Sequence, residues 1–252
     1  GDCDMGNGYS IALVNVLVGT ILTGNPLVGL VGLLIFIAAY MGMAALIHLR
    51  NIPAIVVTLG AQFVWYGIAL ILCPTPGGSC PEMISNFFKL KTPVIPLPII
   101  IAVLAGLVCW MILYRTRYGM VMRGIGNNPN SVERSGWNYL TAKMVNYGMA
   151  GLMVVLAGMT YTVSCNGADA NSSVNYCMLS IATVILGGCE MAGGVVAPAG
   201  VVIAAVAMNL INSLLTAMKV DSNYQTAIIG LILIGVLAFK FIIHRKGASR
   251  NE

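Results

Sequence analysis

The run LVGLVGLLIFIAAYMGMAALI, residues 27–47, contains no charged side chain and decides the fold. Its length matches the roughly 20 apolar residues that a helix needs to cross a bilayer. Lipid offers no hydrogen-bond partner to the backbone, so a spanning segment must pair its own polar groups, as a helix does. Thr23-Gly24-Asn25-Pro26 precedes the run as a turn signal, and His48, Arg50 and Pro53 close it. We therefore expect a transmembrane helix here.

Apolar segments of similar length repeat along the chain. They run from about Tyr9 to Leu22, Ala54 to Leu72, Val94 to Tyr114, Met144 to Val163, Val195 to Leu215 and Tyr224 to Ile243. Tyr176 to Leu186 is apolar but short, and we interpret it, with the glycine pairs that follow, as a short or broken helix. The sequence predicts an all-α polytopic membrane protein with about seven to eight transmembrane helices. We expect residues 1–252 to form a single domain.

The composition agrees with a membrane location. Of the 252 residues, 58% are hydrophobic and only 8% are charged, whereas a soluble domain carries about 25% charged residues. So few charges cannot cover a surface that faces water. The same numbers exclude a disordered chain and a nucleic-acid-binding protein, and the formal net charge of +5 is small. Most of the chain must therefore face lipid.

The distribution of Lys and Arg predicts the topology, because basic residues are enriched in cytoplasmic loops. If the polar stretch 115–143 is cytoplasmic, ten of the thirteen basic residues lie on that side. They are Arg50, Arg115, Arg117, Arg123, Arg134, Lys143, Lys240, Arg245, Lys246 and Arg250. Only Lys89, Lys91 and Lys219 fall on the other side. We expect a cytoplasmic C-terminus and external loops over Cys73 to Thr92 and Ser164 to Asn175.

Signatures of enzymes, metal sites and nucleotide sites are absent from the sequence. The two histidines, His48 and His244, cannot form an H-E-x-x-H site, and no cysteines are spaced as C-x-x-C. The glycine-rich run from Gly187 to Gly194 lacks the lysine of a P-loop and instead suits close backbone packing at a helix break. We expect no catalytic residue, no metal ligand and no cofactor, and a membrane enzyme is the least favoured alternative.

Two questions stay open on the residues alone. The pairs Cys73 with Cys80 and Cys165 with Cys177 are candidate disulfides of external loops, against the alternative that each cysteine is small apolar filler. Charge inside the membrane usually marks an ion-driven carrier, and Glu190, between two glycine pairs, is the main candidate. A secondary carrier or channel that uses Glu190 is therefore an alternative. Otherwise the energy for transport must come from a partner.

The longest polar stretch, residues 115–143, is a candidate docking element. Asn127 to Asn130 offers side chains that cap helices, and Ser131 to Ser135 can form one short helix ended by Gly136. Such a helix between two membrane spans would suit a soluble partner, whereas the plainer alternative is a passive solvated loop. Physical reasoning alone favours neither.

The same loop resembles that of ABC importer permeases of the ribose, xylose and simple-sugar type, in the branched-chain amino acid and sugar superfamily. The matching positions are Tyr118-Gly119, Ile125-Gly126, Asn128 and Ser135-Gly136. The departures from the usual pattern are Asn127, Ser131, Val132 and Glu133-Arg134. Further matches follow one order along the chain: Gly1, Asp4 and Gly8, then Pro53 and Thr58-Leu59-Gly60, then Leu186-Gly187-Gly188 and Gly193-Gly194, then Tyr224-Gln225. The resemblance also implies that the family's first helices precede Gly1.

The resemblance implies a permease subunit of an ATP-driven importer in the bacterial inner (plasma) membrane. Its expected partners are ATP-binding cassette subunits, a soluble substrate-binding protein, a second permease copy (identical or different) and membrane lipid. The docking role carries over to Gly126, Asn128, Ser131, Val132, Ser135 and Gly136. A path for a sugar-like solute should offer neutral hydrogen-bonding groups, and the candidates of this kind are Asn15, Gln62, Trp65, Tyr66, Asn209 and Asn212. Asp4 is a further candidate for the path. Nucleosides, signalling sugars and branched-chain amino acids are alternative solutes, since similar permeases handle them.

Overall fold

The computed structural model describes residues 2–88, 97–190, 194–221, 224–232, 234–235 and 238. Several predicted positions lie outside these residues, namely Gly1, Lys89, Lys91, Gly193, Lys240, His244, Arg245, Lys246 and Arg250. The chain divides into two compact units, each described here by itself. The first runs to Cys177 and includes Gly194, and the second comprises residues 178–191 and 195–252.

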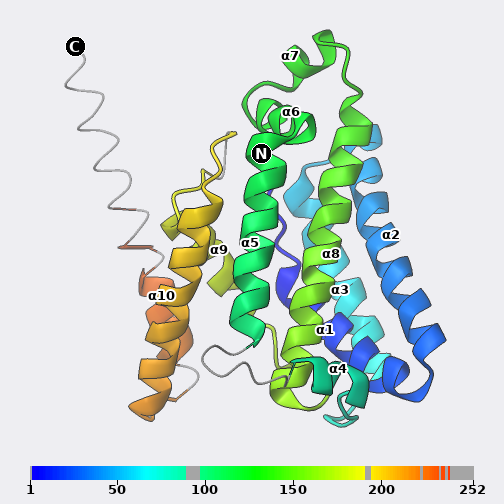
Figure 1. The fold of residues 1–252 in the computed structure, drawn as a ribbon, viewed down its shortest axis with the longest axis vertical. Helices are drawn as coiled ribbons and strands as arrows, with labels where there is room; N and C mark the ends of the chain where they lie inside the picture. The colour runs from blue at the N-terminus through cyan, green and yellow to red at the C-terminus, as the bar shows by residue number, and fades with distance from the viewer. Residues whose placement is uncertain are drawn as a thin grey trace. The chain divides into compact units, whose positions relative to one another are not determined.

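The first unit is a bundle of helices. Its elements are α1 (Asn7–Val16), which continues as the π-helical turn η1 (Leu17–Leu22), α2 (Pro26–Arg50), α3 (Ala54–Leu72), α4 (Glu82–Phe88), α5 (Leu97–Arg115), α6 (Arg117–Asn127), α7 (Pro129–Arg134), α8 (Tyr139–Cys165) and the start of α9 (Tyr176–Leu186). The helix α1 packs against both α3 and α8, and α2 packs against α8. Figure 1 shows α1, α2, α3 and α8 running side by side.

The core of this unit lies around α1 and the facing sides of α2, α3 and α8. Val14 and Val16 of α1 are fully buried, and Phe36 and Tyr40 of α2 pack their rings against Trp65 of α3. The outer faces of these helices carry large exposed apolar side chains. An apolar exterior around a partly polar interior is what a lipid-facing bundle requires, since lipid does not drive apolar side chains inward.

Two glycines allow α8 to approach its neighbours closely. A Cβ atom on Gly158 would overlap the side chain of Val14 on α1, and one on Gly151 would lie 3.2 Å from the ring of Tyr40 on α2. Small residues at such crossings let helix backbones come near each other in membranes. Gly158 and Gly151 therefore set the spacing of the bundle.

The second unit contains the rest of α9, α10 (Pro198–Ala217) and a helical stretch at residues 224–232. Leu179, Ala182, Met208 and Ile229 form its buried cluster. A Cβ atom on Gly200 would overlap the carbonyl oxygen of Gly187, so these two glycines bring the end of α9 against the start of α10. The expected close backbone packing at the glycine-rich break is confirmed.

The all-helical fold is confirmed, and no strand forms among the described residues, where an isolated bridge joins Gly77 and Ala168. Four described helices are long and apolar enough to span a membrane, namely α2, α3, α8 and α10. A fifth arises if α5 and α6, bent by 79° from each other, count as one broken span. The predicted total of seven to eight spans and the side of the C-terminus stay predictions. The helices α4 and α6 and the π-helical turn were not predicted.

Candidate functional site

The polar stretch after α5 folds into an elbow made of α6 and α7. The chain turns at Thr116, whose hydroxyl oxygen accepts a hydrogen bond from the Gly119 backbone N–H at 3.1 Å and so caps α6. A Cβ atom on Gly119 would overlap the carbonyl oxygens of Ile112 and Leu113. Glycine at this position therefore lets α6 fold back sharply against the end of α5.

The second arm of the elbow is the predicted short helix, found one to two residues earlier as α7. Asn128 caps it by accepting a hydrogen bond from the Ser131 backbone N–H at 3.4 Å, and Pro129 occupies the first helical position. Gly136 follows the helix with a φ of +83°, a left-handed conformation that favours glycine. The expected cap and stop signals are thereby confirmed.

The two faces of α7 differ. Val132 is buried against Val121 of α6 and Ala142 of α8, with Ile125 alongside. Asn128, Ser131, Ser135 and Gly136 are exposed, and Gly126 is half-buried. Of the six predicted docking residues, four therefore share an accessible surface, while Val132 holds the elbow to the bundle.

Gly194, a residue of the glycine-rich run, also contacts the elbow. Its backbone N–H donates a hydrogen bond to the side-chain oxygen of Asn127 at 3.3 Å. A Cβ atom on Gly194 would overlap the carbonyl oxygen of Arg123. The departure from the family pattern at Asn127 thus supplies a specific contact.

A buried polar cluster surrounds the beginning of α1. The Tyr40 hydroxyl lies 3.1 Å from a carboxylate oxygen of Asp4 and 2.8 Å from the hydroxyl of Ser10. A phenol has a single hydrogen, so the Tyr40 hydroxyl donates to the Asp4 carboxylate and accepts a hydrogen bond from the Ser10 hydroxyl. The Met5 backbone N–H donates to the Thr58 hydroxyl at 3.2 Å. This cluster ties the start of α1 to both α2 and α3.

One ion pair continues the cluster toward α8. The Lys143 ammonium group lies 2.8 Å from Asp2, and the Lys143 side chain is only 7% exposed. The Tyr147 hydroxyl donates to the same carboxylate at 3.4 Å. Sequence reasoning assigned Lys143 to a polar loop and missed this burial. The signal was its position directly before the apolar segment that begins at Met144, because the helix α8 starts one turn earlier, at Tyr139.

The predicted path residues of the first unit take different positions. Asn15 is fully buried and accepts a hydrogen bond from the Asp169 backbone N–H at 3.2 Å. Trp65 is buried in the aromatic cluster. Gln62 and Tyr66 are half-buried on α3, where the Tyr66 hydroxyl donates to the Asn171 side-chain oxygen at 2.7 Å. The structure therefore brings Asp4, Asn15 and Trp65 into the interior and leaves Gln62 and Tyr66 accessible.

The two path candidates of the second unit lie together. A cavity of about 490 Å³ is lined by α10 residues Asn209, Asn212, Ser213, Thr216 and Ala217. The side-chain oxygen of Asn212 is buried and has no hydrogen-bond partner among the described residues. The cavity thus offers the neutral polar groups expected beside a hydroxylated solute.

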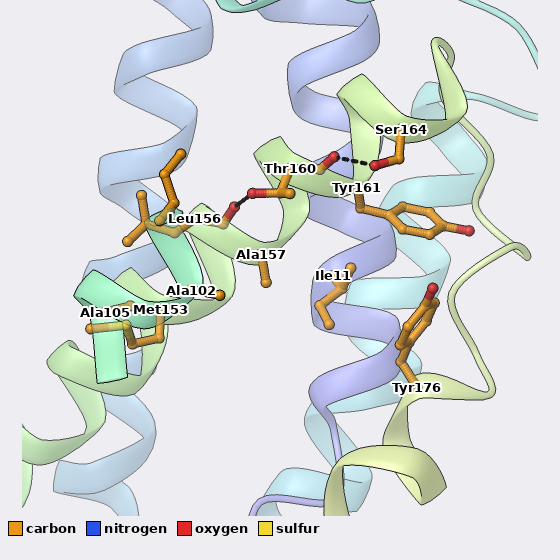
Figure 2. A pocket seen from close by; sticks show the side chains of 11 residues that line it. Ile11, Ala102, Ala105, Met153, Leu156, Ala157, Thr160, Tyr161, Ser164 and Tyr176 are labelled. Atoms are coloured by element: carbon orange, nitrogen blue, oxygen red, sulfur yellow. Dashed lines mark hydrogen bonds between the residues drawn. The ribbon is translucent and has the colours of Figure 1, made fainter. Parts of the chain in front are cut away.

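A second cavity, of about 380 Å³, lies in the first unit between α1, α5 and α8. Figure 2 shows Tyr161 and Tyr176 at one end and Ala102, Ala105 and Met153 at the other. Three of the hydroxyls that line it are already engaged, because Thr160 and Ser164 donate to carbonyl oxygens of their own helix and Tyr161 donates to the Ser172 carbonyl oxygen. This cavity suits apolar groups better than a polyol.

Two open questions from the sequence have structural answers. The seven cysteines all lie among the described residues and none of them forms a disulfide, so neither candidate pair is bridged. The Cys73 thiol donates to the carbonyl oxygens of Thr75 and Ala168, and the Cys177 thiol to that of Met5.

Glu190 is exposed, and its backbone N–H donates to the Val195 carbonyl oxygen. An exposed carboxylate lacks the buried setting of an ion-coupling group.

Helices of spanning length with apolar outer faces are the features of a multi-pass membrane protein. The family model described as the permease component of branched-chain amino acid transport systems matches residues 4–237. The chain therefore belongs to this permease family and, like its relatives, is a multi-pass protein of the bacterial inner membrane.

The relatives confirm the predicted resemblance to sugar-importer permeases. The ribose import permease protein of Bacillus subtilis is 31% identical, over 94% of this chain and 76% of that protein. The autoinducer 2 import system permease protein of Photorhabdus laumondii is 25% identical, over 97% and 77%. The D-allose transport system permease protein of Escherichia coli is 26% identical, over 79% and 62%. No solved structure gives a significant match.

Proposed function

We propose that this chain is the membrane subunit of an ATP-driven importer for a sugar or sugar-like solute. The observation that carries the proposal is the elbow, where α7 presents polar side chains on one face and buries Val132 on the other. The relatives named above import ribose, D-allose and autoinducer 2. ATP is hydrolysed by partner subunits, and this chain supplies no catalytic residue, metal ligand or cofactor site.

The ATPase subunits dock on the exposed face of the elbow, which comprises Asn128, Ser131, Ser135 and Gly136, with Gly126 at its edge. Val132 packs against Val121 and Ala142, so a push on α7 moves α6 and the first turn of α8 together. Lys143, on that same turn, is bound to Asp2. The movement that accompanies closure of the ATPase subunits is thereby transmitted to the buried cluster at the start of α1.

The solute arrives from a soluble substrate-binding protein that docks on the loops at the other end of the bundle. Residues 77 and 168 of these loops are joined by backbone hydrogen bonds of 2.7 and 3.0 Å. Two permease copies enclose the path, for which Gln62 and Tyr66 of the first unit and Asn209 and Asn212 of the second unit are the candidates. The path carries neutral amide and hydroxyl groups because a sugar presents hydroxyls and no fixed charge.

An ion-coupled carrier is the second candidate function, and one observation favours it. Asp4 and the pair of Asp2 with Lys143 place ionisable groups inside the bundle, as carriers and pumps do. These residues, more than the exposed Glu190, would then bind the coupling ion. The importer is preferred because the family and its relatives are permease components of transport systems.

The test is co-purification of the chain, with cognate ATPase subunits, from membranes. Wild type is compared with the double variant Gly126→Asp plus Ser135→Asp, which adds negative charge to the docking face. The matched control is Ser164→Asp, an exposed serine at the opposite end of α8. Capture of the ATPase by wild type and by the control, with loss in the double variant, supports the proposal. Equal capture by all three, or none by wild type, overturns it and favours the carrier.

A further inference from the structure

A group of partly exposed side chains lies where α1, α3 and the loop 166–175 meet. The rings of Tyr9 and Tyr66 are tilted against each other with centroids 4.9 Å apart. The Tyr66 hydroxyl donates to Asn171, and Gln62 lies one turn of α3 before Tyr66. All four residues belong to the first unit.

Gln62 makes no hydrogen bond to any other described residue, although its side chain is half-buried and α3 is a membrane-spanning helix. An amide offers two donors and an acceptor, and leaving them unpaired away from water is costly. Asn171 is exposed and offers its NH₂ group beside the Tyr66 hydroxyl. The amide of Gln62 therefore lacks a polar partner among the described residues, and the Asn171 amide is free to bind a second one.

Lipid cannot be that partner, because it has no donors or acceptors in its hydrocarbon region. A tilted pair of aromatic rings flanked by amides combines apolar ring faces with directed hydrogen bonds, as small-molecule sites do. A monosaccharide matches both, since its ring has C–H faces as well as hydroxyl edges. The carboxylate of Asp169, which accepts from the Asn171 backbone N–H at 2.9 Å, adds a further acceptor nearby.

We infer that Tyr9, Gln62, Tyr66 and Asn171 form a contact site for a neutral, polyhydroxylated ring during its passage. The inference rests on the proposed importer function and names the residues that touch the solute. Tyr9 and Tyr66 receive a C–H face of the ring, and Gln62 and Asn171 bind its hydroxyls. Asp4, Asn15 and Trp65 support this site from the interior and do not touch the solute.

The test uses the full chain with its ATPase and binding-protein partners in membrane vesicles. Uptake of radiolabelled ribose and methyl galactoside is measured for Gln62→Leu and Tyr66→Phe. Each variant removes hydrogen-bonding groups and keeps most of the volume. Phe63→Leu is the matched control, because Phe63 is next to Gln62 on α3 but 68% exposed and outside the group. ATPase co-purification is measured on every variant.

In Gln62→Leu, loss of one hydrogen bond to a bound hydroxyl is expected to lower uptake about tenfold. In Tyr66→Phe the Asn171 side chain loses the hydrogen bond that positions it, so uptake should fall as well, by a smaller factor. The ratio of ribose to methyl galactoside uptake should also change, since the two solutes present different hydroxyls. The control should stay near wild type, and ATPase co-purification should be retained throughout.

Unchanged uptake in both variants, or equal losses for both solutes with no change in their ratio, overturns the site and leaves the importer intact. Failure of the ATPase to co-purify with wild type overturns the importer itself. If either variant loses the ATPase while Phe63→Leu keeps it, the residue supports the fold and the assigned contact is wrong.

Discussion

The ammonium group of Lys143 lies 2.8 Å from the carboxylate of Asp2 and joins the first turns of α8 to the segment before α1. Seven residues earlier, Gly136 ends the elbow. The pair is therefore placed between the proposed ATPase-docking face and the buried cluster of Asp4, Tyr40 and Ser10. In the proposed mechanism, this ion pair transmits a movement of the elbow to the centre of the bundle.

Breaking the pair should destabilise the protein strongly. In Lys143→Met the carboxylate of Asp2 loses its cation, and breaking a buried pair costs about 3–5 kcal/mol. Because the Asp2 side chain is 33% exposed, we expect the lower end of that range. The measurement is thermal unfolding of the purified protein in detergent. The double variant Asp2→Asn plus Lys143→Met should recover much of the loss, since no charge is left unpaired. Additive losses in the double variant would contradict a direct pair.

The contact between Gly158 and Val14 should tolerate no added methyl group. In Gly158→Ala the new Cβ atom overlaps the Val14 side chain, and overpacking of this kind costs about 1–3 kcal/mol. Gly60→Ala is the control, because nothing lies within 4 Å of a Cβ atom placed there. Thermal unfolding of both variants checks this. Equal melting temperatures for Gly158→Ala and wild type would mean that α1 and α8 are not in close contact.

The helices that span the membrane were predictable because lipid imposes one rule on every segment. The run at residues 27–47 and its turn signal mark α2, and the predicted span from Ala54 to Leu72 coincides with α3. That rule does not apply to α6, because α6 is not an apolar segment. Its sequence alternates glycine with polar and apolar residues and predicts a loop. Its helix depends on Thr116 as a cap and on contacts with α8.

The candidate site was less predictable because function there depends on which side of a helix a residue occupies. Asn15, Gln62 and Trp65 are all polar or aromatic residues inside predicted spans, and nothing local separates them. The fold buries Asn15 and Trp65 and leaves Gln62 half-exposed. Tyr9 and Asn171 join the group through contacts across more than 50 residues, which no local pattern encodes.

The turn after α7 should depend on the backbone of Gly136 alone. Its φ is +83° and no atom lies within 4 Å of a Cβ atom placed there. In Gly136→Ala the left-handed conformation costs about 1–2 kcal/mol, which weakens the elbow and should reduce ATPase co-purification. Gly67→Ala has equally open space within α3 and should be neutral or stabilising. Equal capture of the ATPase by both variants would show that ATPase docking does not depend on the conformation of this turn.

Cys165 should report the sidedness of the bundle. It is the last residue of α8 and is exposed, whereas Cys73, Cys80 and Cys189 are buried. A membrane-impermeant maleimide reacts with accessible thiolates, so it should label intact cells that carry the wild-type chain and not those that carry Cys165→Ser. In the Cys165→Ser background, Ser131→Cys places a thiol on the exposed face of the elbow and should react only after the membrane is permeabilised. The positive-inside distribution requires this pattern. Labelling of Ser131→Cys in intact cells would invert the topology and remove the elbow from the side where ATP is available.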